Sequence, residues 1–380
     1  MTVPESPLSN SLLRRTVVIA TDSFKSSISA EAAAAEIAAG WGERFPHDEL
    51  LLIAQADGGE GTLDAIERSV PGAIRCNAGA VTGPDGRPTA GAWLELPGGV
   101  AIVELAQCSG LPLMAKPDAL GATTRGLGEV IGKALDAGAR SLVIALGGSA
   151  STDGGTGALR ALGLELFDRS GVPLAEGGAA LAGLVTVDIG SLRTPPPDGV
   201  TLLTDVSNPL TGSAGAAAIF GPQKGANPAA VEMLDAALVH LALLLPGAVS
   251  TITPGTGAAG GTAWGFASVW GATITPGSEY LARLTGLEAA LSRADVVITG
   301  EGRFDETSLN GKVVGHVIAL AQRFGIPVTV IAGQLACEPP SGIGAISLAG
   351  LAGSIEAALA DPRPLLRTAA RLLAHHQSLS

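Results

Sequence analysis

Residues 17–29 read Val-Val-Ile-Ala-Thr-Asp-Ser-Phe-Lys-Ser-Ser-Ile-Ser, so that an apolar run leads directly into a polar turn. An alanine-rich stretch at 30–45 follows and is typical of a helix. A second apolar run at 50–54 has its own glycine-rich turn at 57–61 and a helical stretch at 62–69. Strand, turn and helix in this repeated order predict the β-α-β units of a parallel sheet.

The rhythm of strand and helix breaks at residues 74–106. Short alternating runs beside Pro84-Asp85-Gly86 and Pro97-Gly98-Gly99 predict antiparallel hairpins. Alternation then resumes with a helix at 123–137, strands at 142–146 and 201–204, and helices after Asn227-Pro228 and Thr275-Pro276, where a cap residue precedes a proline. A second α/β unit with a mixed sheet is therefore expected in the middle of the chain.

Three more strands of the buried type follow near the C-terminus, at 295–299, 328–332 and 345–348. We interpret them as the missing half of the first sheet. The prediction is an α/β fold of two domains: a Rossmann-like parallel-sheet domain from residues 1–72 and 292–380, and a mixed α/β domain, residues 73–291, inserted into it. The active site is expected in the cleft between them. The assignment requires the strands at 17–21 and 295–299 to lie in one sheet.

Composition excludes several classes of function. The 380 residues carry a formal net charge of −12 and include only one Tyr and seven Phe, so nucleic acid is not expected as a partner. No apolar run reaches the roughly 18 residues that cross a bilayer, and the run behind Arg14 and Arg15 is too short for a signal peptide. Cys76, Cys108 and Cys337 follow no zinc or redox spacing. A cytoplasmic protein with free thiols and no membrane contact is expected.

Polar, glycine-rich clusters follow the expected strands or lie in connections, at 21–27, 57–62, 147–157, 204–210, 221–225 and 300–312. Ligands of open α/β sheets bind beyond the carboxyl ends of the strands, so we expect these clusters to converge. The run Gly-Gly-Ser-Ala-Ser-Thr-Asp-Gly-Gly at 147–155 suits a phosphate, because it offers backbone N–H groups and hydroxyls. A tight, well-capped turn is the alternative explanation. The candidate phosphate-binding residues are Gly147, Gly148, Ser149, Ser151 and Thr152.

Charged residues in these clusters indicate phosphoryl transfer. Lys25, beside Asp22 and Ser23, can neutralise a phosphate or a carboxylate, although a capped helix start would look the same. A phosphoryl transferase also needs carboxylates to hold magnesium and to accept the proton of an alcohol. Four carboxylates in this charge-poor chain stand beside glycine, asparagine or arginine, namely Asp57, Asp205, Glu301 and Asp305.

Arg303 follows a strand, where its guanidinium can clamp a carboxylate, but an ion pair with Asp305 or Glu301 accounts for it equally well. Gly311-Lys312 lacks the rest of a P-loop. Residues 255–260 do match G-x-G-x-x-G, which leaves a nicotinamide-dependent oxidoreductase as an alternative. No histidine accompanies a serine or cysteine in a hydrolase signature.

With these residues laid out, the chain resembles the bacterial class-one glycerate kinase family over roughly residues 16–334. The motifs keep the family's order: Asp-Ser-Phe-Lys at 22–25, Asp-Gly-Gly-Glu-Gly-Thr at 57–62, Val-Glu-Leu-Ala-Gln at 103–107, Gly-Gly-Ser-Ala-Ser-Thr-Asp-Gly-Gly at 147–155, Asp-Val-Ser-Asn-Pro-Leu at 205–210, Phe-Gly-Pro-Gln-Lys-Gly-Ala at 220–226, and Thr-Gly-Glu-Gly-Arg-Phe-Asp at 299–305.

The resemblance implies ATP-dependent, Mg²⁺-assisted phosphorylation of D-glycerate, usually to 2-phosphoglycerate. Catalytic roles are expected for Lys25, Asp205 and Arg303, and magnesium binding for Asp57 and Asp205. Substrate or phosphate binding is expected for residues from four clusters: Asp22, Ser23, Gly147, Gly148, Ser149, Ser151, Thr152, Asn208, Lys224, Glu301 and Lys312.

Three positions depart from the family pattern. Thr21, Ser26 and Thr152 stand where proline, glycine and asparagine are expected, and we expect them to affect substrate preference. A non-catalytic small-molecule sensor remains a further alternative. The cluster that binds adenine and the oligomeric state, a homo-oligomer included, stay open at this point.

Overall fold

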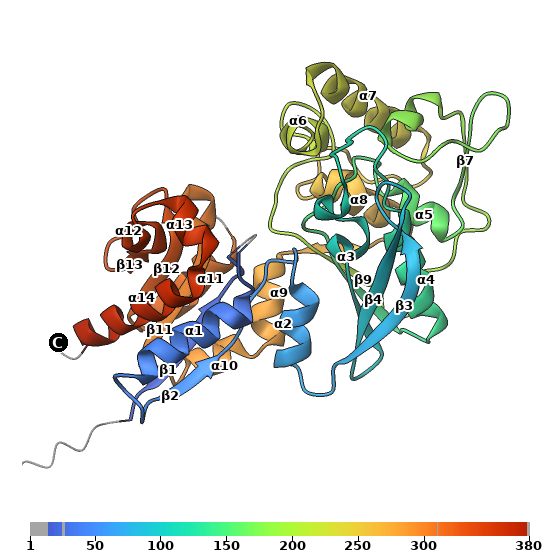
Figure 1. Cartoon of the computed structure of the whole chain (residues 1–380). Coiled ribbons are helices and arrows are strands. Elements are labelled where there is room, and N and C mark those ends of the chain that lie inside the picture. Colours follow the sequence, from blue (N-terminus) through green and yellow to red (C-terminus); the bar gives the residue numbers. More distant parts are fainter. Residues whose placement is uncertain (1–13, 25–26, 310, 378–380) are drawn as a thin grey trace, which may run out of the picture. The chain divides into compact units, whose positions relative to one another are not determined.

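The structure is a computed structural model that describes residues 14–24, 27–309 and 311–377. The chain divides into two compact units, drawn in Figure 1. The first contains Met1–Ala54, Leu287–Glu306 and Val317–Ser380, and the second contains Gln55–Gly286 and Thr307–His316. These boundaries differ from the sequence-based ones, because residues 55–72 belong to the second unit. There the helix α2 (Thr62–Ser69) packs against β5 (Val100–Glu104).

The first unit is built on a five-stranded parallel sheet with the order β13-β12-β11-β1-β2. Its strands are β1 (Thr16–Thr21), β2 (Glu49–Leu52), β11 (Val296–Phe304), β12 (Val328–Leu335) and β13 (Gly344–Ser347). Val17 pairs with Val296 and Thr21 with Gly300, so the two ends of the chain share one sheet, as the sequence predicted.

Helices cover this sheet. On one face α1 (Ala30–Gly42) and α14 (Pro362–Gln377) lie side by side, with α12 (Leu348–Ala352) and α13 (Ile355–Ala360) completing the layer (Figure 1). The core of this layer includes Val17 and Ile19 from β1. Since Val18 points to the opposite face and is equally buried, the other face is covered too, in part by α10 (Leu287–Leu291).

The strand order places a topological switch point between β1 and β11. From β1 the chain runs through α1 to β2 on one side, and from β11 it runs through α11 (Val313–Arg323) to β12 on the other. Because such crossovers are right-handed, α1 and α11 lie on opposite faces of the sheet. The crevice at the carboxyl ends of β1 and β11 is where ligands bind in folds of this kind.

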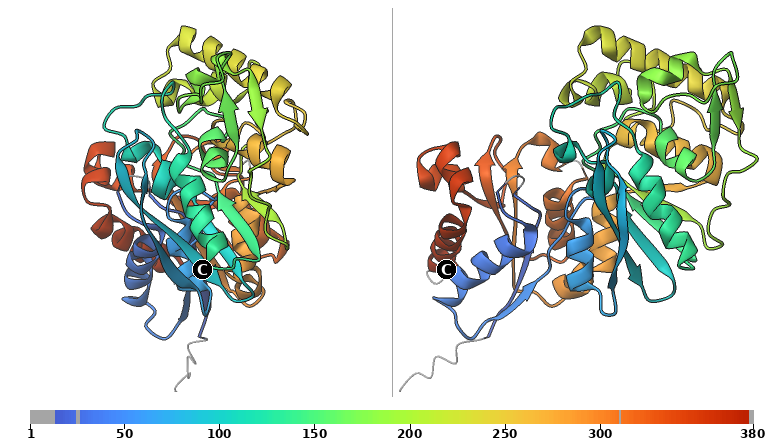
Figure 2. Two further views of the ribbon diagram at one scale, coloured as in Figure 1. Left: turned by 90° about the vertical axis from the view of Figure 1, so that its right-hand side faces the viewer. Right: turned by 45° about the vertical axis from the view of Figure 1, so that its right-hand side comes forward.

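The second unit is built on a six-stranded mixed sheet with the order β10-β9-β6-β5-β4-β3. The strands not yet named are β3 (Ile74–Thr82), β4 (Pro88–Leu96), β6 (Ser141–Ala145), β9 (Val200–Leu203) and β10 (Thr273–Thr275). β3, β4 and β5 pair in antiparallel fashion, which confirms the predicted hairpins, and Figure 2 shows β3 and β4 as a long ribbon. β5, β6, β9 and β10 run parallel. β7 (Glu165–Phe167) and β8 (Thr186–Asp188) form a separate ribbon.

The remaining helices of this unit surround the mixed sheet. They are α3 (Leu105–Ser109), α4 (Arg125–Asp136), α5 (Thr156–Ala161), α6 (Ala216–Phe220), α7 (Pro228–Leu244), α8 (Ala258–Trp270) and α9 (Gly277–Leu284), with short 3₁₀ turns η1 (Leu111–Leu113), η2 (Gly178–Gly183), η3 (Pro222–Lys224) and η4 (Glu306–Leu309). α7 begins as predicted, since the Asn227 side chain accepts a hydrogen bond from the Ala230 N–H. α9 begins at Gly277, one residue after the expected proline.

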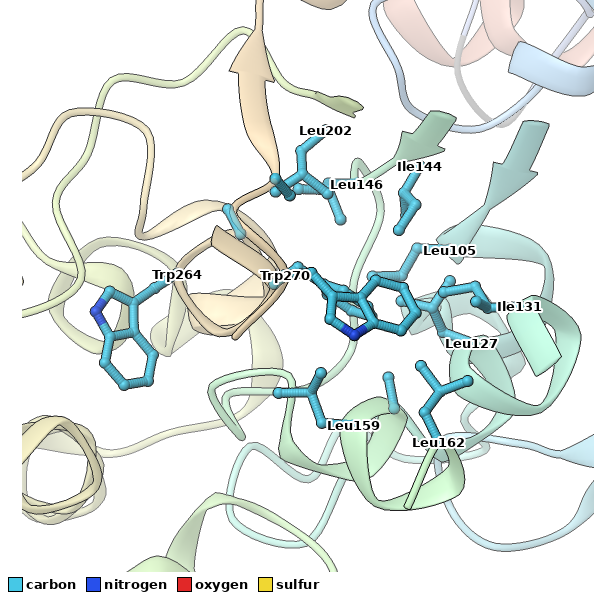
Figure 3. Close-up of a cluster of buried hydrophobic side chains, with 14 of the residues drawn as sticks. Leu105, Leu127, Ile131, Ile144, Leu146, Leu159, Leu162, Leu202, Trp264 and Trp270 are labelled. Carbon is cyan, nitrogen blue, oxygen red and sulfur yellow. The ribbon is translucent and has the colours of Figure 1, made fainter. Parts of the chain in front are cut away.

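Aliphatic and aromatic side chains fill the core of the second unit. Figure 3 shows Leu202 of β9 and Ile144 of β6 beside Leu146, with the Trp264 and Trp270 rings from α8 in the same cluster. Leu202 is 0% exposed. This core fixes the ends of β6 and β9, from which two of the polar clusters start. Within the described ranges, no helix is both long and apolar enough to cross a bilayer.

Truncation of Leu202 should destabilise the second unit. We expect Leu202→Ala to lower the free energy of unfolding by about 2–5 kcal/mol, because it removes buried methyl groups and leaves a cavity. Urea titration followed by tryptophan fluorescence measures this, since three of the four tryptophans lie in the second unit. Ile252→Ala is the control, as Ile252 is 77% exposed. Equal midpoints for both variants would contradict the assignment of Leu202 to the core.

Candidate functional site

Four parallel strands of the second unit end at the same edge of its sheet. β5 ends at Glu104, β6 leads into the loop 147–152, β9 leads to Asp205, and β10 leads into the start of α9. Parallel strands bring their carboxyl ends to one edge, so two of the predicted clusters, at 147–157 and 204–210, lie together there. We call residues 147–152 the glycine-serine loop.

The turn that carries Asp57 packs on the glycine-serine loop. The Gly147 N–H donates to the carbonyl of Gly58 at 2.8 Å, and the Asp57 carboxylate accepts from the Gly59 N–H at 3.0 Å. A Cβ atom at position 147 would overlap the backbone of Gly59. Glycine is therefore required at 147 for a steric reason, and Gly148 is required for another, because its φ of +75° is left-handed.

Several N–H groups of the glycine-serine loop have no acceptor within the described part of the chain. The loop is anchored by two backbone hydrogen bonds to residues 109–111, in which Ala150 donates to Ser109 and Gly148 accepts from Leu111. The backbone N–H groups of Gly148, Ser149 and Thr152 donate to none of the described residues. Uncommitted N–H groups in a glycine-rich turn form the kind of concavity that binds anions.

Lys224 lies buried against this loop. Its side chain is in η3, is 2% exposed, and donates from Nζ to the carbonyl oxygen of Ser151 and to the hydroxyl of Ser149, the latter at 3.5 Å. The Ser149 and Ser151 hydroxyl oxygens are 3.2 Å apart. Burial lowers the pKa of Lys224 to about 8, and the nearby Asp153 carboxylate partly opposes this shift. A cation is thus held directly beneath the loop.

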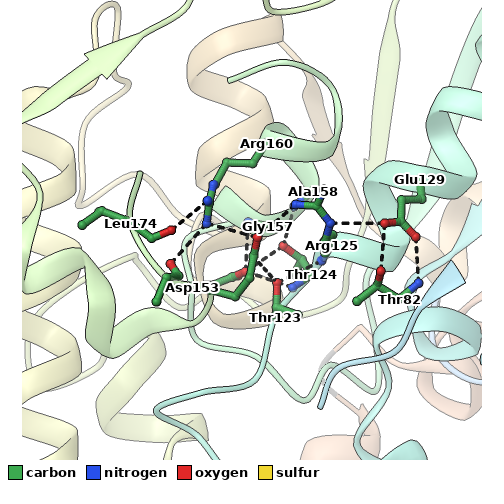
Figure 4. Close-up of polar contacts among 12 residues, drawn as sticks. Thr82, Thr123, Thr124, Arg125, Glu129, Asp153, Gly157, Ala158, Arg160 and Leu174 are labelled. Atoms are coloured by element: carbon green, nitrogen blue, oxygen red, sulfur yellow. Dashed lines mark hydrogen bonds and ion pairs between the residues drawn. The ribbon is translucent and has the colours of Figure 1, made fainter. Parts of the chain in front are cut away.

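Asp153 anchors the end of the loop, and its complete burial keeps it from contacting a ligand. Figure 4 shows its carboxylate among Thr124 and Gly157. It accepts from the Thr124 N–H and hydroxyl at 2.9 and 2.8 Å, from the Gly157 N–H at 3.1 Å, and from the Gly155 N–H at 3.0 Å. Complete burial raises its pKa. Asp153 therefore fixes the turn into α5.

Asp205 caps α9 from a distant part of the sequence. Its carboxylate accepts from the Gly277 N–H at 2.7 Å and from the Ser278 N–H at 3.2 Å. Burial raises the pKa of Asp205 to about 7, and the second cause is the negative charge of Asp57. Asp57 and Asp205 are therefore close enough to interact electrostatically, as the proposed pair of magnesium ligands requires.

Glu104 binds backbone N–H groups at the start of α2, just after the turn that carries Asp57, as Asp205 does at the start of α9. It is 3% exposed and accepts from the Gly61 and Leu63 N–H groups at 3.2 and 3.0 Å, at the start of α2. Burial raises its pKa to about 7. Glu104 lies in the family motif at 103–107, but no role was predicted for it. A carboxylate that directly ends a buried strand is the signal that could have identified it.

The first unit has a polar cluster of its own at the switch point between β1 and β11. The Asp22 N–H donates to the Gly300 carbonyl at 2.8 Å, and the Asp22 carboxylate accepts from the Ser23 N–H at 2.6 Å. Glu301 on β11 is 8% exposed. Asp22 and Ser23 thus directly follow β1, as the sequence predicted. Glu301 and Arg303 do not follow their strand but lie within it, because β11 continues to Phe304 by pairing with β12. Lys25 and Ser26 lie outside the described residues.

Arg303 forms the ion pair that the sequence analysis gave as the alternative to a ligand contact. Its Nε lies 3.3 Å from the Asp305 carboxylate, and Nη1 donates to the Gln334 side chain at 3.3 Å. The Arg303 side chain is nevertheless 61% exposed. An exposed ion pair contributes about 1 kcal/mol or less, so this contact does not prevent the guanidinium from binding an anion.

The other candidate residues are engaged with the protein. Asn208 donates to the Ala214 carbonyl at 2.9 Å, and Lys312 donates to the Thr307 hydroxyl at 2.7 Å. Of the departures from the family pattern, Thr21 is buried and donates to the Ala30 carbonyl at 3.0 Å, so it supports the start of α1. Thr152 is 0% exposed, and its hydroxyl has no partner among the described residues.

The G-x-G-x-x-G match at 255–260 is not a dinucleotide-binding loop. The fingerprint requires a strand that leads directly into the loop. In the described chain, the segment directly before residue 255 is instead formed by α7 and irregular turns. Its glycines serve packing instead: a Cβ at 257 would overlap the Pro209 carbonyl, and one at 260 would overlap the Ser151 carbonyl. Such a fingerprint also needs an acidic residue about 20 residues further on to bind the ribose, and the candidate at that distance, Glu279, lies on α9 beside Arg283. The motif therefore gives an oxidoreductase no support.

Comparisons with known proteins agree with this geometry. The profile of the glycerate kinase family matches residues 17–377. A glycerate kinase of Bacillus subtilis (strain 168) is 40% identical over 84% of this chain and 85% of its own length. A glycerate 2-kinase of Escherichia coli (strain K12) is 41% identical over the same shares. A crystal structure of a protein assigned as glycerate kinase 2 from Salmonella typhimurium LT2 has a TM-score of 0.78 and 36% identity, covering 96% of this chain and 99% of that one.

The chain belongs to the glycerate kinase family. The resemblance found in the sequence motifs is confirmed, and with it the kinase class of enzyme and the α/β fold. This glycerate kinase family member departs from the family pattern at three positions. The structure describes two of them, Thr21 and Thr152, and Ser26 lies outside the described residues.

The residues present suit a magnesium ion that arrives with a nucleotide. The described part of the chain holds no group of three or more His, Cys, Asp or Glu that could bind a metal by itself. Mg²⁺ is usually held by one or two carboxylates together with substrate phosphates, rather than by a cage of protein ligands. The interacting pair Asp57 and Asp205 matches this donor set.

The buried ammonium of Lys224 should be detectable in the pH dependence of stability. Its pKa is about 8 in the folded chain and 10.5 as the ordinary value, so between these pH values the unfolded chain binds more protons. Stability attributable to Lys224 therefore rises with pH across this window, by about 3 kcal/mol in total.

We expect the difference in unfolding free energy between the wild type and Lys224→Met to change by about 2 kcal/mol from pH 7.5 to pH 10, since these two pH values cover most of the window. Urea titrations at both pH values measure it. Lys116→Met is the control, since Lys116 is exposed. If the two variants showed the same pH dependence, Lys224 would not be a buried cation.

Proposed function

We propose that this protein transfers the γ-phosphoryl group of ATP to D-glycerate with the help of Mg²⁺, and that its product is 2-phosphoglycerate. Membership of the glycerate kinase family supports the reaction. Similarity to a glycerate 2-kinase of Escherichia coli supports the position of the phosphate.

The observation that carries the proposal is the glycine-serine loop with Lys224 beneath it. Three uncommitted backbone N–H groups and a buried ammonium meet at the carboxyl end of β6. Phosphoryl transfer depends on positioning and on stabilisation of the phosphate charge, and fixed N–H groups and cations in a dry environment supply both. A packed turn requires neither the buried lysine nor the free N–H groups.

Asp57 and Asp205 are the proposed magnesium ligands. When bound, Mg²⁺ would neutralise phosphate charge on ATP. The protein's own contribution is to hold the two carboxylates: the α9 N–H groups fix Asp205, and the backbone turn at Gly58 and Gly59 fixes Asp57.

Roles for the remaining candidates follow from their chemistry. We assign Arg303 and Lys25 to the glycerate carboxylate or to the transferring phosphoryl group, because a guanidinium and an ammonium can neutralise either. The hydroxyl groups of glycerate can be bound at the switch point. There the carboxylates of Asp22 and Glu301 can accept hydrogen bonds, and the Ser23 hydroxyl can donate or accept one. Asn208 and Lys312 are assigned to substrate or phosphate contacts made after their present partners are released.

Product analysis tests the proposed function directly. The purified chain with ATP, Mg²⁺ and D-glycerate should yield ADP and one phosphate monoester, which phosphorus NMR distinguishes as 2- or 3-phosphoglycerate. L-glycerate and a reaction without Mg²⁺ are the controls. The 3-phosphate would overturn the proposed position of transfer. Intact ATP beside bound glycerate would overturn the kinase and leave a sensor.

Asp205→Asn separates catalysis from stability. The asparagine side chain keeps one of the two acceptor oxygens, so it can still accept from the Gly277 N–H, while the Ser278 N–H loses the second oxygen as a partner. The raised pKa of Asp205 means that its ionised form is disfavoured in the folded state near neutral pH, and removal of this charge offsets the lost hydrogen bond, so the variant should fold with a stability close to that of the wild type. We expect the turnover number to fall on the order of 10²-fold or more, because a charge that acts in the reaction is lost.

A magnesium titration of the same variant identifies the role of the carboxylate. If Asp205 binds the metal, the Mg²⁺ concentration for half-maximal activity rises. If Asp205 accepts a proton instead, turnover stays low at saturating Mg²⁺ with an unchanged midpoint. Asp235→Asn is the matched control, because the Asp235 carboxylate also accepts a backbone N–H, that of Gly212, but belongs to α7. Wild-type turnover in Asp205→Asn would exclude this residue from the reaction.

A further inference from the structure

One helix of the second unit exposes an apolar stripe. On α7 the exposed positions include Met233, Ala236, Val239 and Leu243, which recur every three or four residues and so lie on one face. Leu243 is 79% exposed and Met233 48%. The opposite face is buried against the core through Leu234, Leu238 and Leu241. We call residues 229–243 on the exposed face the α7 stripe.

The α7 stripe is almost without charge in a chain of net charge −12. Glu232 is the one ionisable residue of the exposed class on it. Asp235 lies beside the stripe, and its carboxylate accepts the Gly212 N–H at 2.9 Å. Two copies of such an acidic chain repel one another over most surfaces, and a neutral apolar face is where that repulsion is smallest.

The order of residues along the stripe is self-complementary about Ala236. When two α7 helices are laid antiparallel and centred on Ala236, Met233 comes opposite Val239 of the second copy, and Ala229 opposite Leu243. Glu232 comes opposite His240 rather than opposite another Glu232.

This pattern matches what a two-fold axis requires, because each residue must suit its counterpart in both directions. The small side chain of Ala236 at the centre lets the two helices approach closely, and larger apolar side chains flank it on both sides. We propose that the α7 stripe binds a second copy of this chain, in an antiparallel α7–α7 contact centred on Ala236.

The contact should be reversible. From 229 to 243 the stripe is about 21 Å long, so a helix pair alone buries less than the roughly 800 Å² per partner of a standard interface. The dimer should therefore form and dissociate with protein concentration, in the micromolar range.

Sedimentation velocity on the full chain over a concentration series, from about 1 to 200 μM, tests the proposal. We expect a monomer at the lowest concentration and a growing dimer boundary above it. Leu243→Glu should weaken the dimer at least tenfold, because it puts a carboxylate in the apolar contact. The matched control is Leu359→Glu, at a 52% exposed leucine on α13 of the first unit, which should dimerise like the wild type.

Two outcomes of this experiment would overturn the proposal. One is a monomer throughout the concentration series. The other is a dimer that Leu243→Glu and Leu359→Glu affect equally, which would place the contact elsewhere. Both substitutions are at exposed positions, and a circular dichroism melt verifies that each variant is folded.

Cross-linking tests the register independently. With a short bismaleimide linker, Ala236→Cys should give a high yield of covalent dimer, because the two positions face each other across the axis. Glu232→Cys should give little, since its two copies would be about 12 Å apart along the helix axes. The wild type measures the background from Cys76 and Cys337, which are partly exposed. Equal yields from both variants would overturn the antiparallel register.

Discussion

The candidate site of the second unit depends on the close approach of two backbone segments, at Gly59 and Gly147. Only glycine at 147 allows the Asp57 turn to lie on the glycine-serine loop, and the hydrogen bond from Gly147 to the Gly58 carbonyl holds the two together. The Asp57 carboxylate and a set of N–H groups that donate to none of the described residues are thereby fixed beside one another after β6. Side-chain interactions could not do this as rigidly, because rotatable side chains lose entropy when they are fixed.

Around this contact the protein keeps charges that burial disfavours. Glu104, Asp205 and Lys224 all have pKa values shifted toward their neutral forms, with burial as the main cause. Each nevertheless has a mechanical function, as Glu104 holds α2, Asp205 holds α9, and Lys224 holds the glycine-serine loop. Shifted pKa values gathered at one sheet edge are typical of functional sites, where stability is given up so that charged groups are held in place before the ligand binds.

Local patterns were enough to predict most elements, because apolar runs, caps and turns act within a few residues. The strand at 17–20, the hairpins beyond residue 74 and the Asn227 cap of α7 are of this kind. The start of α9 was not predictable locally, since Asp205 caps it from 72 residues away. The G-x-G-x-x-G match failed for the same reason: its glycines are set by contacts with Pro209 and Ser151, which only the fold brings near.

The candidate site residues also fall into two groups: those that local sequence patterns could predict, and those that only the fold brings together. The sequence could predict that Gly147 and Asp205 follow parallel strands, because strand order at a sheet edge follows from the β-α-β pattern. It could not predict that Lys224 is buried, because a lysine in a turn is usually exposed. Only the packing of η3 against the glycine-serine loop places its ammonium at the Ser151 carbonyl.

The position of Lys224 also answers how a chain of net charge −12 can bind an anion. An exposed lysine would be screened by salt and would compete with the negative field of the whole surface. A buried ammonium acts through a medium of low dielectric constant, so its field on the loop is stronger at the same distance. The loop N–H groups that donate to none of the described residues add partial positive charge without any counter-ion. In the proposed reaction, the loop could therefore attract phosphate locally although the chain as a whole is acidic.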